Sequence, residues 1–337
     1  MQTEQIVFTA PGVAELQQTE IPAPAAGQVQ VRIAVSAVSS GTERANLLGS
    51  DTLSWVVPKC KAQFPRVLGY SSAGVVEQVG GGVTAFAPGD RVALSWSTHT
   101  HVQNIPAANV TPIGDIPFEE AALFHIATFP LAAIRKCKLE LGESAIVMGM
   151  GILGLTAVKL LRAAGAAPIL AVDPDPVKRQ IALTHGADHA LDPFAPDFAQ
   201  TAKELTGGGA KVGIEVTGIG AGLDGILDCM ARFGRVALLG CTRSSDFTID
   251  YYRKVHGPGI TLVGAHTNAR PAADSSDGWW TEKDDMRALC TLTKTGRLDL
   301  AALLQETHSP AAATEVYRRL AEEKTFPIVE FDWRKLS

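Results

Sequence analysis

The chain has 337 residues, of which 46% are hydrophobic and 19% charged, a globular composition that excludes a disordered or fibrous chain. Lysine and arginine total 30 against 35 acidic residues, so the net charge is -5. Because no basic run accompanies this charge, the sequence argues against nucleic acid or an anionic membrane as a partner.

No targeting or membrane signal stands out in the sequence. The first residues lack a positively charged region leading into an apolar segment, and no apolar run reaches the ~18 residues that a membrane span needs. The five cysteines are scattered and never spaced as CxxC. This pattern favours reduced, buried thiols, and we expect a cytoplasmic protein.

Short β-rich runs broken by glycine and proline fill the first part of the chain, and after Phe118 the pattern changes to alternating strands and helices. The predicted β-rich runs are 6–10, 28–38, 72–80 and 90–96. The later predicted strands are 145–149, 168–173, 211–218, 235–240 and 260–266, and the predicted helices include 155–164, 176–185 and 220–232. The alternation predicts an α/β fold with a doubly wound parallel sheet covered by helices on both faces.

The end of the chain is expected to return to the first domain. A loop rich in turn formers follows His266, a helix is predicted at 282–295, and a final strand at 326–333. At this length about two domains are expected. We therefore predict a β-rich domain made of residues 1–123 and 267–337, interrupted by a nucleotide-binding domain at 124–266.

A GxGxxG fingerprint joins a predicted strand to a predicted helix, at Gly149, Gly151 and Gly154. The first glycine permits the tight turn, the second lets the backbone approach a pyrophosphate, and the third lets helix pack on strand. Asp173 ends the next strand about 20 residues on, where it would bind the adenosine ribose and repel the extra phosphate of NADP. The fingerprint predicts an NAD(H) site; the alternative is a purely structural glycine turn.

These segments resemble the medium-chain dehydrogenase/reductase superfamily, the alcohol dehydrogenase-like proteins, over nearly the whole chain. The resemblance is carried by VSAVSSGTER, FPRVLGYSSAGVVEQVG, APGDRVAL, GMGILG, VDPDPVKR, IEVTG and GRVALLG. It implies a GroES-like β-rich catalytic domain, a Rossmann domain and hydride transfer at a nicotinamide. It also implies a homodimer or homotetramer, formed by edge pairing of strand 260–266.

The resemblance breaks at the metal positions of zinc-dependent relatives. Those positions match Ser40, Tyr70 with Ser71, and Phe124, none of which is a normal zinc ligand. The structural zinc lobe is also missing, because residues 90–109 contain no cysteine. We expect neither a catalytic nor a structural zinc.

Without zinc, another group must handle the proton. Thr42 matches the proton-relay hydroxyl of relatives, and Ser40 and Tyr70 would lie beside it, so these three hydroxyls are catalytic candidates. The alternative for Tyr70 is that it fills the volume left by the metal. Glu43 and His125 are further candidates, with structural roles as their alternatives.

One histidine pair and one tryptophan pair are further candidates for a functional role. His99 and His101 form an HxH pair, whose spacing suggests metal binding, but two ligands alone do not form a metal site. Trp279 and Trp280 could cap a substrate pocket or an oligomer interface, or could pack in the core.

Further cofactor contacts are expected around the fingerprint. Thr128 matches a position close to the nicotinamide, and Lys178 matches a lysine near the ribose, with an exposed helix-start cation as the alternative. The carboxyl ends of parallel strands line the ligand crevice. The remaining candidates are Ile152, Leu153, Val216, Thr217 and Gly240.

The leading functional hypothesis is a zinc-independent NAD(H)-dependent oxidoreductase of a secondary alcohol or carbonyl, such as a polyol or sugar. One alternative is a reductase of activated alkenes or quinones, although such relatives commonly use NADPH. The other is a cofactor-binding sensor or scaffold without catalysis. The substrate itself is not predicted, because fold does not fix function.

Overall fold

The computed structural model describes residues 1–51, 60–243, 245 and 247–336. The chain divides into two compact units, one made of 1–126 with 304–337 and the other of 127–303. The predicted return to the first unit at residue 267 therefore comes later, at 304. The reason is that residues 275–294 pack on α3 (Phe124–Lys136), where Arg135 lies 3.6 Å over the Trp280 ring and bonds Asp285 at 3.0 Å.

The first unit is β-rich, as predicted. Its three-stranded sheet has the order β2-β1-β4, and its seven-stranded sheet runs β15-β16-β3-β5-β6-β8, with β7 paired to β3. The strands are β1 (Gln2–Ala10), β2 (Val13–Glu20), β3 (Gln28–Ala37), β4 (Arg66–Val67), β5 (Ser71–Val79), β6 (Arg91–Ser95), β7 (Val102–Pro106), β8 (Val110–Pro112), β15 (Glu306–His308) and β16 (Val329–Asp332). Its helices are α1 (Ser40–Leu47), α2 (Phe118–Ala121) and α9 (Ala313–Glu322).

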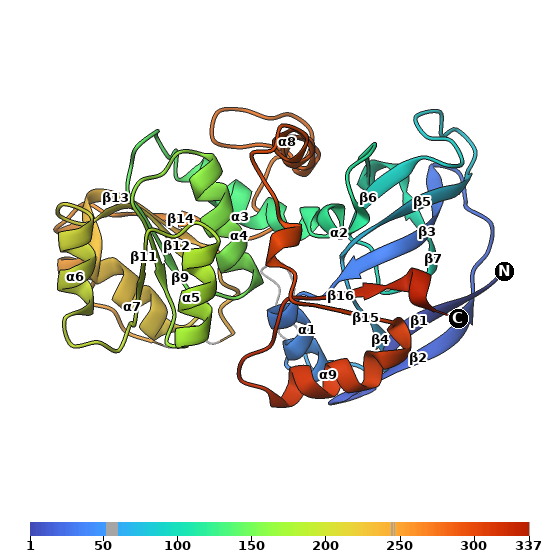
Figure 1. The fold of residues 1–337 in the computed structure, drawn as a ribbon, viewed down its shortest axis with the longest axis horizontal. Helices are drawn as coiled ribbons and strands as arrows, with labels where there is room; N and C mark the ends of the chain where they lie inside the picture. Colours follow the sequence, from blue (N-terminus) through green and yellow to red (C-terminus); the bar gives the residue numbers. More distant parts are fainter. Residues whose placement is uncertain (52–59, 244, 246, 337) are drawn as a thin grey trace. The chain divides into compact units, whose positions relative to one another are not determined.

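The core of this unit joins both ends of the chain. Figure 1 shows β15, β16 and α9, in red, among the blue and cyan strands of the N-terminal part. Buried residues of α9 and β16, such as Tyr317 and Phe331, share one cluster with Phe8 and Ile33. Strand β16 pairs antiparallel with β3, so the C-terminal segment is an integral part of the sheet.

The second unit is the predicted doubly wound sheet. Its six strands are all parallel and follow the order β11-β10-β9-β12-β13-β14. The strands are β9 (Ala145–Met148), β10 (Ile169–Val172), β11 (His189–Leu191), β12 (Ala210–Glu215), β13 (Met230–Leu238) and β14 (Thr261–Gly264). Its helices are α4 (Ile152–Ala163), α5 (Pro176–Thr184), α6 (Phe198–Leu205), α7 (Gly220–Asp228) and α8 (Glu282–Lys294), and α3 continues into it.

Every residue of β9 and β10 is buried, which requires helices on both faces because successive side chains alternate sides. On one face Ile146 and Val172 pack with Phe198 of α6 and Ile226 of α7. The helix predicted at 220–232 is shorter than expected. It ends at Asp228, because Met230 already pairs with Ala210 as part of β13.

Candidate active site

The glycine turn follows β9 at the point where the strand order reverses, between β9 and β12. Gly149 has φ +101°, a conformation that L side chains rarely adopt, and a Cβ on Gly154 would lie 1.8 Å from the Gly149 carbonyl oxygen. A Cβ on Gly151 would meet nothing within 4 Å. The turn therefore needs the first and third glycines for its own packing and leaves open space at the second.

The N-terminus of α4 is suited to an anion. Its N-cap is Gly151, and no side chain from the described residues caps it. Backbone N–H groups at such a terminus, together with the helix dipole, favour a phosphate. Of the predicted contacts at this terminus, Ile152 is buried and Leu153 half-buried.

Asp173 is tied to the glycine turn. One carboxylate oxygen accepts from Met150 N at 2.8 Å and the other from Asp175 N at 2.9 Å, and the residue is buried. The sequence indicated only a ribose contact here, whereas the structure adds a role in holding the turn against the start of α5. Asp175 caps α5 by accepting from Val177 N, and Lys178 lies half-buried in the first turn.

The loops after β12 and β13 lie at the carboxyl ends of their strands, as the glycine turn does after β9. Burial raises the pKa of Glu215, whose carboxylate accepts from Thr217 N at 2.7 Å, from the Thr217 hydroxyl and from Gly218 N. A Cβ on Gly240 would lie 2.3 Å from Gly218 N, so these two loops touch. Val216 is half-buried and Thr217 exposed at the edge where the crevice is expected. Thr128 is buried on α3, and its contact with a nicotinamide stays a prediction.

The predicted hydroxyls lie in the first unit around the start of α1. Ser40 is half-buried and Thr42 exposed in the first turn, and Tyr70 precedes β5. The Tyr70 hydroxyl is hydrogen-bonded to Ser39 Oγ, a residue that the sequence analysis missed although it adjoins Ser40. The hydroxyl partner seen in the structure is thus the N-cap residue of α1.

His125 lies against aromatic rings. Its ring centroid is 5.6 Å from that of Tyr70 and 4.7 Å from that of Trp96, and the residue is fully buried. This burial favours the packing alternative over acid or base catalysis, and a catalytic role of His125 stays a prediction.

Glu43 and His99 form a buried pair beneath α1. Glu43 accepts from Ser39 N at 2.8 Å and from the Tyr317 hydroxyl at 2.5 Å, and His99 Nε2 lies 3.2 Å from its carboxylate. Burial alone would raise the pKa of Glu43, but His99 and these hydrogen bonds outweigh it and hold the pKa below its usual value. Glu43 is thus an ionised carboxylate that holds its neighbours in place.

The two histidines of the HxH pair have separate partners. His101 Nδ1 lies 3.3 Å from a carboxylate oxygen of Glu4, and its ring stacks on Trp333 with centroids 5.7 Å apart. Since His99 faces Glu43 instead, the pair does not converge on a common point.

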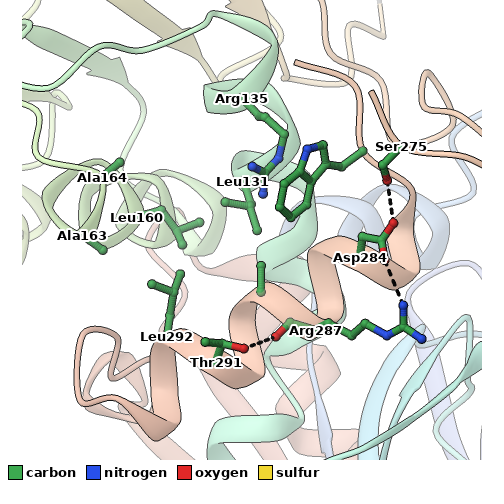
Figure 2. A pocket seen from close by; sticks show the side chains of 12 residues that line it. Leu131, Arg135, Leu160, Ala163, Ala164, Ser275, Asp284, Arg287, Thr291 and Leu292 are labelled. Atoms are coloured by element: carbon green, nitrogen blue, oxygen red, sulfur yellow. Dashed lines mark hydrogen bonds and ion pairs between the residues drawn. The ribbon is translucent and has the colours of Figure 1, made fainter. Parts of the chain in front are cut away.

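A cavity of about 610 Å³ in the second unit is separate from the glycine turn. Figure 2 shows Leu131, Leu160 and Leu292 in its wall, and Asp284 bonded to Ser275 and Arg287 at its rim. Leu160 lies near the C-terminal end of α4, whereas the turn lies at its N-terminal end, and 12 helical residues span ~18 Å. Trp280 lines this cavity, and a role of the tryptophan pair at a substrate pocket or an oligomer interface stays a prediction.

Two family models match the chain in tandem. Residues 25–112 match the alcohol dehydrogenase GroES-like domain, and residues 153–276 match a model described as zinc-binding dehydrogenase. The chain belongs to the medium-chain dehydrogenase/reductase superfamily. Membership confirms the predicted GroES-like and Rossmann architecture and makes the protein an oxidoreductase of the alcohol dehydrogenase type, a nicotinamide-dependent family.

Relatives within the superfamily include the D-guloside 3-dehydrogenase of Escherichia coli K12, 26% identical over 95% of this chain and 96% of that protein. The L-threonine 3-dehydrogenase of Pyrococcus horikoshii is 27% identical over 77% of this chain and 81% of its own length. The structure of benzyl alcohol dehydrogenase from Acinetobacter calcoaceticus superposes with a TM-score of 0.84 at 19% identity, covering 98% and 99% of the two chains. That likeness shows the shared fold.

The description of the model that matches residues 153–276 names zinc, and the absence of zinc from this chain stays a prediction. At the three positions that the sequence analysis matched to zinc ligands, Ser40, Tyr70 and Phe124 offer two neutral hydroxyls and a phenyl ring, whereas zinc is bound by thiolate, imidazole or carboxylate. Across the part of the chain that the structure describes, no three His, Cys, Asp or Glu residues cluster as metal ligands.

The same part contains no helix long and apolar enough to cross a membrane.

Proposed function

We propose that this protein is a zinc-independent, NAD(H)-dependent oxidoreductase of a secondary alcohol or carbonyl in a polyol, sugar or similarly hydroxylated substrate. The observation that carries the proposal is the set of side chains at the metal positions. Ser40 and Tyr70 present hydroxyls there in place of zinc ligands, which leaves proton transfer to hydroxyl groups.

The cofactor would be held by the second unit. The open space at Gly151 and the uncapped start of α4 suit the pyrophosphate, and Asp173 suits the ribose hydroxyls. When bound, the nicotinamide supplies the hydride acceptor or donor. The relatives named for a guloside and for threonine act on hydroxylated compounds, which supports a polar alcohol as substrate here.

The protein's own residues would orient the substrate and move its proton. The Tyr70 hydroxyl, fixed by Ser39, would hydrogen-bond the substrate oxygen, and Thr42, exposed in the first turn of α1, would pass the proton to water. The proposal includes a homodimer or homotetramer, because β14 is the edge of its sheet and exposes Leu262.

The deciding experiment is turnover without metal. Protein purified in chelator is incubated with NAD and a panel of polyols, sugars and secondary alcohols, while NADH absorbance and bound zinc are measured. NADH formation at substoichiometric zinc supports the proposal, and activity that appears only with stoichiometric zinc overturns it. If the protein binds NADH but forms none from any compound of the panel, the reduction of activated alkenes or quinones is favoured. That reaction is tested with a panel of such compounds and NADH as the hydride donor.

Asp173→Ala is expected to lower the preference for NAD(H) over NADP(H) by roughly tenfold or more. The variant removes the ribose acceptor and the negative charge that repels the extra phosphate, and a tenfold change corresponds to about 1.4 kcal/mol. The measurement is the Kd ratio of NADH and NADPH. Asp175→Ala is the matched control, since this neighbour caps α5 and its loss should cost stability, about 1 kcal/mol, without changing the ratio. If Asp173→Ala leaves the ratio of the Kd values for NADH and NADPH unchanged, Asp173 does not contact the ribose.

Tyr70→Phe and Thr42→Val are each expected to lower kcat at least tenfold while the Kd for NADH stays the same. Each variant removes a single hydroxyl and keeps the side-chain shape nearly constant, so the loss would report proton transfer rather than folding. Steady-state kinetics on the substrate found in the panel give the comparison. Full turnover in both variants would refute the hydroxyl mechanism.

A further inference from the structure

A continuous chain of hydrogen bonds runs through the first unit and ends at Tyr70. Trp333 Nε1 donates to Ser36 Oγ at 2.9 Å, and Ser36 Oγ lies 2.7 Å from His99 Nδ1. From His99 the chain continues to Glu43, to the Ser39 backbone N–H and, through Ser39 Oγ, to the Tyr70 hydroxyl. Ser36, Ser39, Glu43, His99 and Trp333 are all buried.

The direction of the bonds to Glu43 and from Trp333 follows from the chemistry of the groups, whereas in the bond between Ser39 and Tyr70 either hydroxyl can donate. An ionised carboxylate only accepts, so His99 Nε2 and the Tyr317 hydroxyl both donate to Glu43. Burial and the Glu43 charge raise the pKa of Tyr317 well above its ordinary value, so its hydroxyl keeps its proton. Because an indole N–H only donates, Ser36 Oγ accepts from Trp333 Nε1, and the direction of its bond with His99 Nδ1 depends on the tautomer of the histidine.

This arrangement fixes the position of Ser39. A buried polar network whose members are all paired is rigid, since breaking any bond leaves an unsatisfied group away from water. The Glu43 carboxylate accepts from Ser39 N at 2.8 Å, and Ser39 is the N-cap of α1 although its side chain makes no capping bond. The Ser39 hydroxyl is instead bonded to Tyr70.

We propose that Ser39 is a positioning residue for the Tyr70 hydroxyl, and that Glu43, with His99 and Tyr317 behind it, acts on Tyr70 through the Ser39 backbone. The sequence analysis named the neighbouring Ser40, as a proton-transfer candidate, and did not name Ser39. It also makes Glu43 an anchor rather than an acid or base. The inference rests on the proposed function only in giving Tyr70 a role in proton transfer.

The contact is tested in protein labelled with 3-fluorotyrosine. The chain has four tyrosines, and the Tyr70 signal in the ¹⁹F spectrum is assigned by its loss in Tyr70→Phe. Ser39→Ala is expected to shift the Tyr70 signal, and Ser39→Thr, which restores a hydroxyl, is expected to return it towards its original position. Ser72→Ala is the matched control, because it removes another buried hydroxyl bond of the same unit, to Ser97 at 2.8 Å. A Tyr70 signal unmoved by Ser39→Ala overturns the inference.

Tyr317→Phe tests the remote part of the network. It removes one donor to Glu43 and no atom of the hydrogen bond between Ser39 and Tyr70, yet the Tyr70 signal is expected to shift. If Ser39→Ala moves the signal and Tyr317→Phe does not, the anchoring role of Glu43 is refuted and only the local contact stands.

Kinetics separate this inference from the proposed function. Ser39→Ala should lower kcat at least tenfold at constant KM for NAD, Ser39→Thr should recover most of it, and adding Tyr70→Phe should cause little further loss. Full turnover in Ser39→Ala would overturn the positioning role. If the wild type oxidises no alcohol, the proposed function fails, whereas the fluorine signals still decide whether Ser39 and Glu43 position Tyr70.

Discussion

Gly154→Ala is expected to destabilise the second unit, whereas Gly151→Ala should leave it folded and weaken NADH binding. The Cβ at 154 would lie 1.8 Å from the Gly149 carbonyl oxygen, so α4 would have to move away from the turn. Overpacking of this kind costs roughly 1–3 kcal/mol. Gly151 has open space around its Cβ position and φ of −81°, which alanine adopts without strain.

The two variants separate folding from binding. At Gly151 the added methyl group would occupy the space in front of the helix N-terminus, where the pyrophosphate backbone contact is expected. We expect at least a tenfold rise in the Kd for NADH and a stability change below about 1 kcal/mol. Thermal unfolding and NADH fluorescence titration measure the two quantities. Normal NADH affinity in Gly151→Ala would show that the cofactor does not approach this turn.

Glu330→Met is expected to stabilise the first unit at neutral pH by roughly 1–3 kcal/mol. Glu330 lies on β16 with no exposed surface, and neither carboxyl oxygen has a hydrogen-bond partner among the described residues. Burial, together with the charges of Glu119 and Glu120, raises the pKa of Glu330 well above its ordinary 4.5. Methionine has a similar volume and no polar group to desolvate.

The stability gained by Glu330→Met should increase as the pH rises. The folded state keeps a proton on Glu330 that the unfolded state releases above pH 4.5, so wild-type stability falls as pH rises through that value towards the folded pKa. The advantage of Glu330→Met is therefore largest at neutral pH and shrinks on acidification. Urea unfolding at several pH values measures it, with Glu15→Met on exposed β2 as control. A gain that does not change with pH would contradict the buried, protonated carboxyl.

The fold could be predicted largely from local signals. The parallel sheet follows from short apolar runs that alternate with helical segments, and the glycine turn from residues within one strand-turn-helix unit. The boundary at 304 could not be predicted in this way. It depends on Arg135 meeting Asp285, a contact between residues far apart in the sequence.

The placement of the candidate cofactor residues could also be predicted from local signals, whereas their roles stay predictions. Gly149, Gly151, Gly154 and Asp173 lie at one edge of the sheet because each follows a strand closely. The network behind Tyr70 was not predictable, since Tyr317 and Trp333 reach Glu43 and Ser36 across 274 and 297 residues. Nothing in the sequence around Ser39 distinguishes it from Ser40; only the fold decides which hydroxyl meets Tyr70.

The late return of the chain to the first unit also sets an order of events during translation. Residues 127–303 can leave the ribosome and fold as one continuous segment, because domains generally fold as units during synthesis. The first unit cannot complete its folding until β16 and Trp333 have emerged from the ribosome. Strand β16 pairs with β3, and the buried Trp333 indole donates a hydrogen bond to Ser36 Oγ. In the interval residues 35–37 of β3 lack the strand β16 that pairs with them, although β7 can already pair with residues 28–32, so this end of β3 is exposed to premature strand pairing.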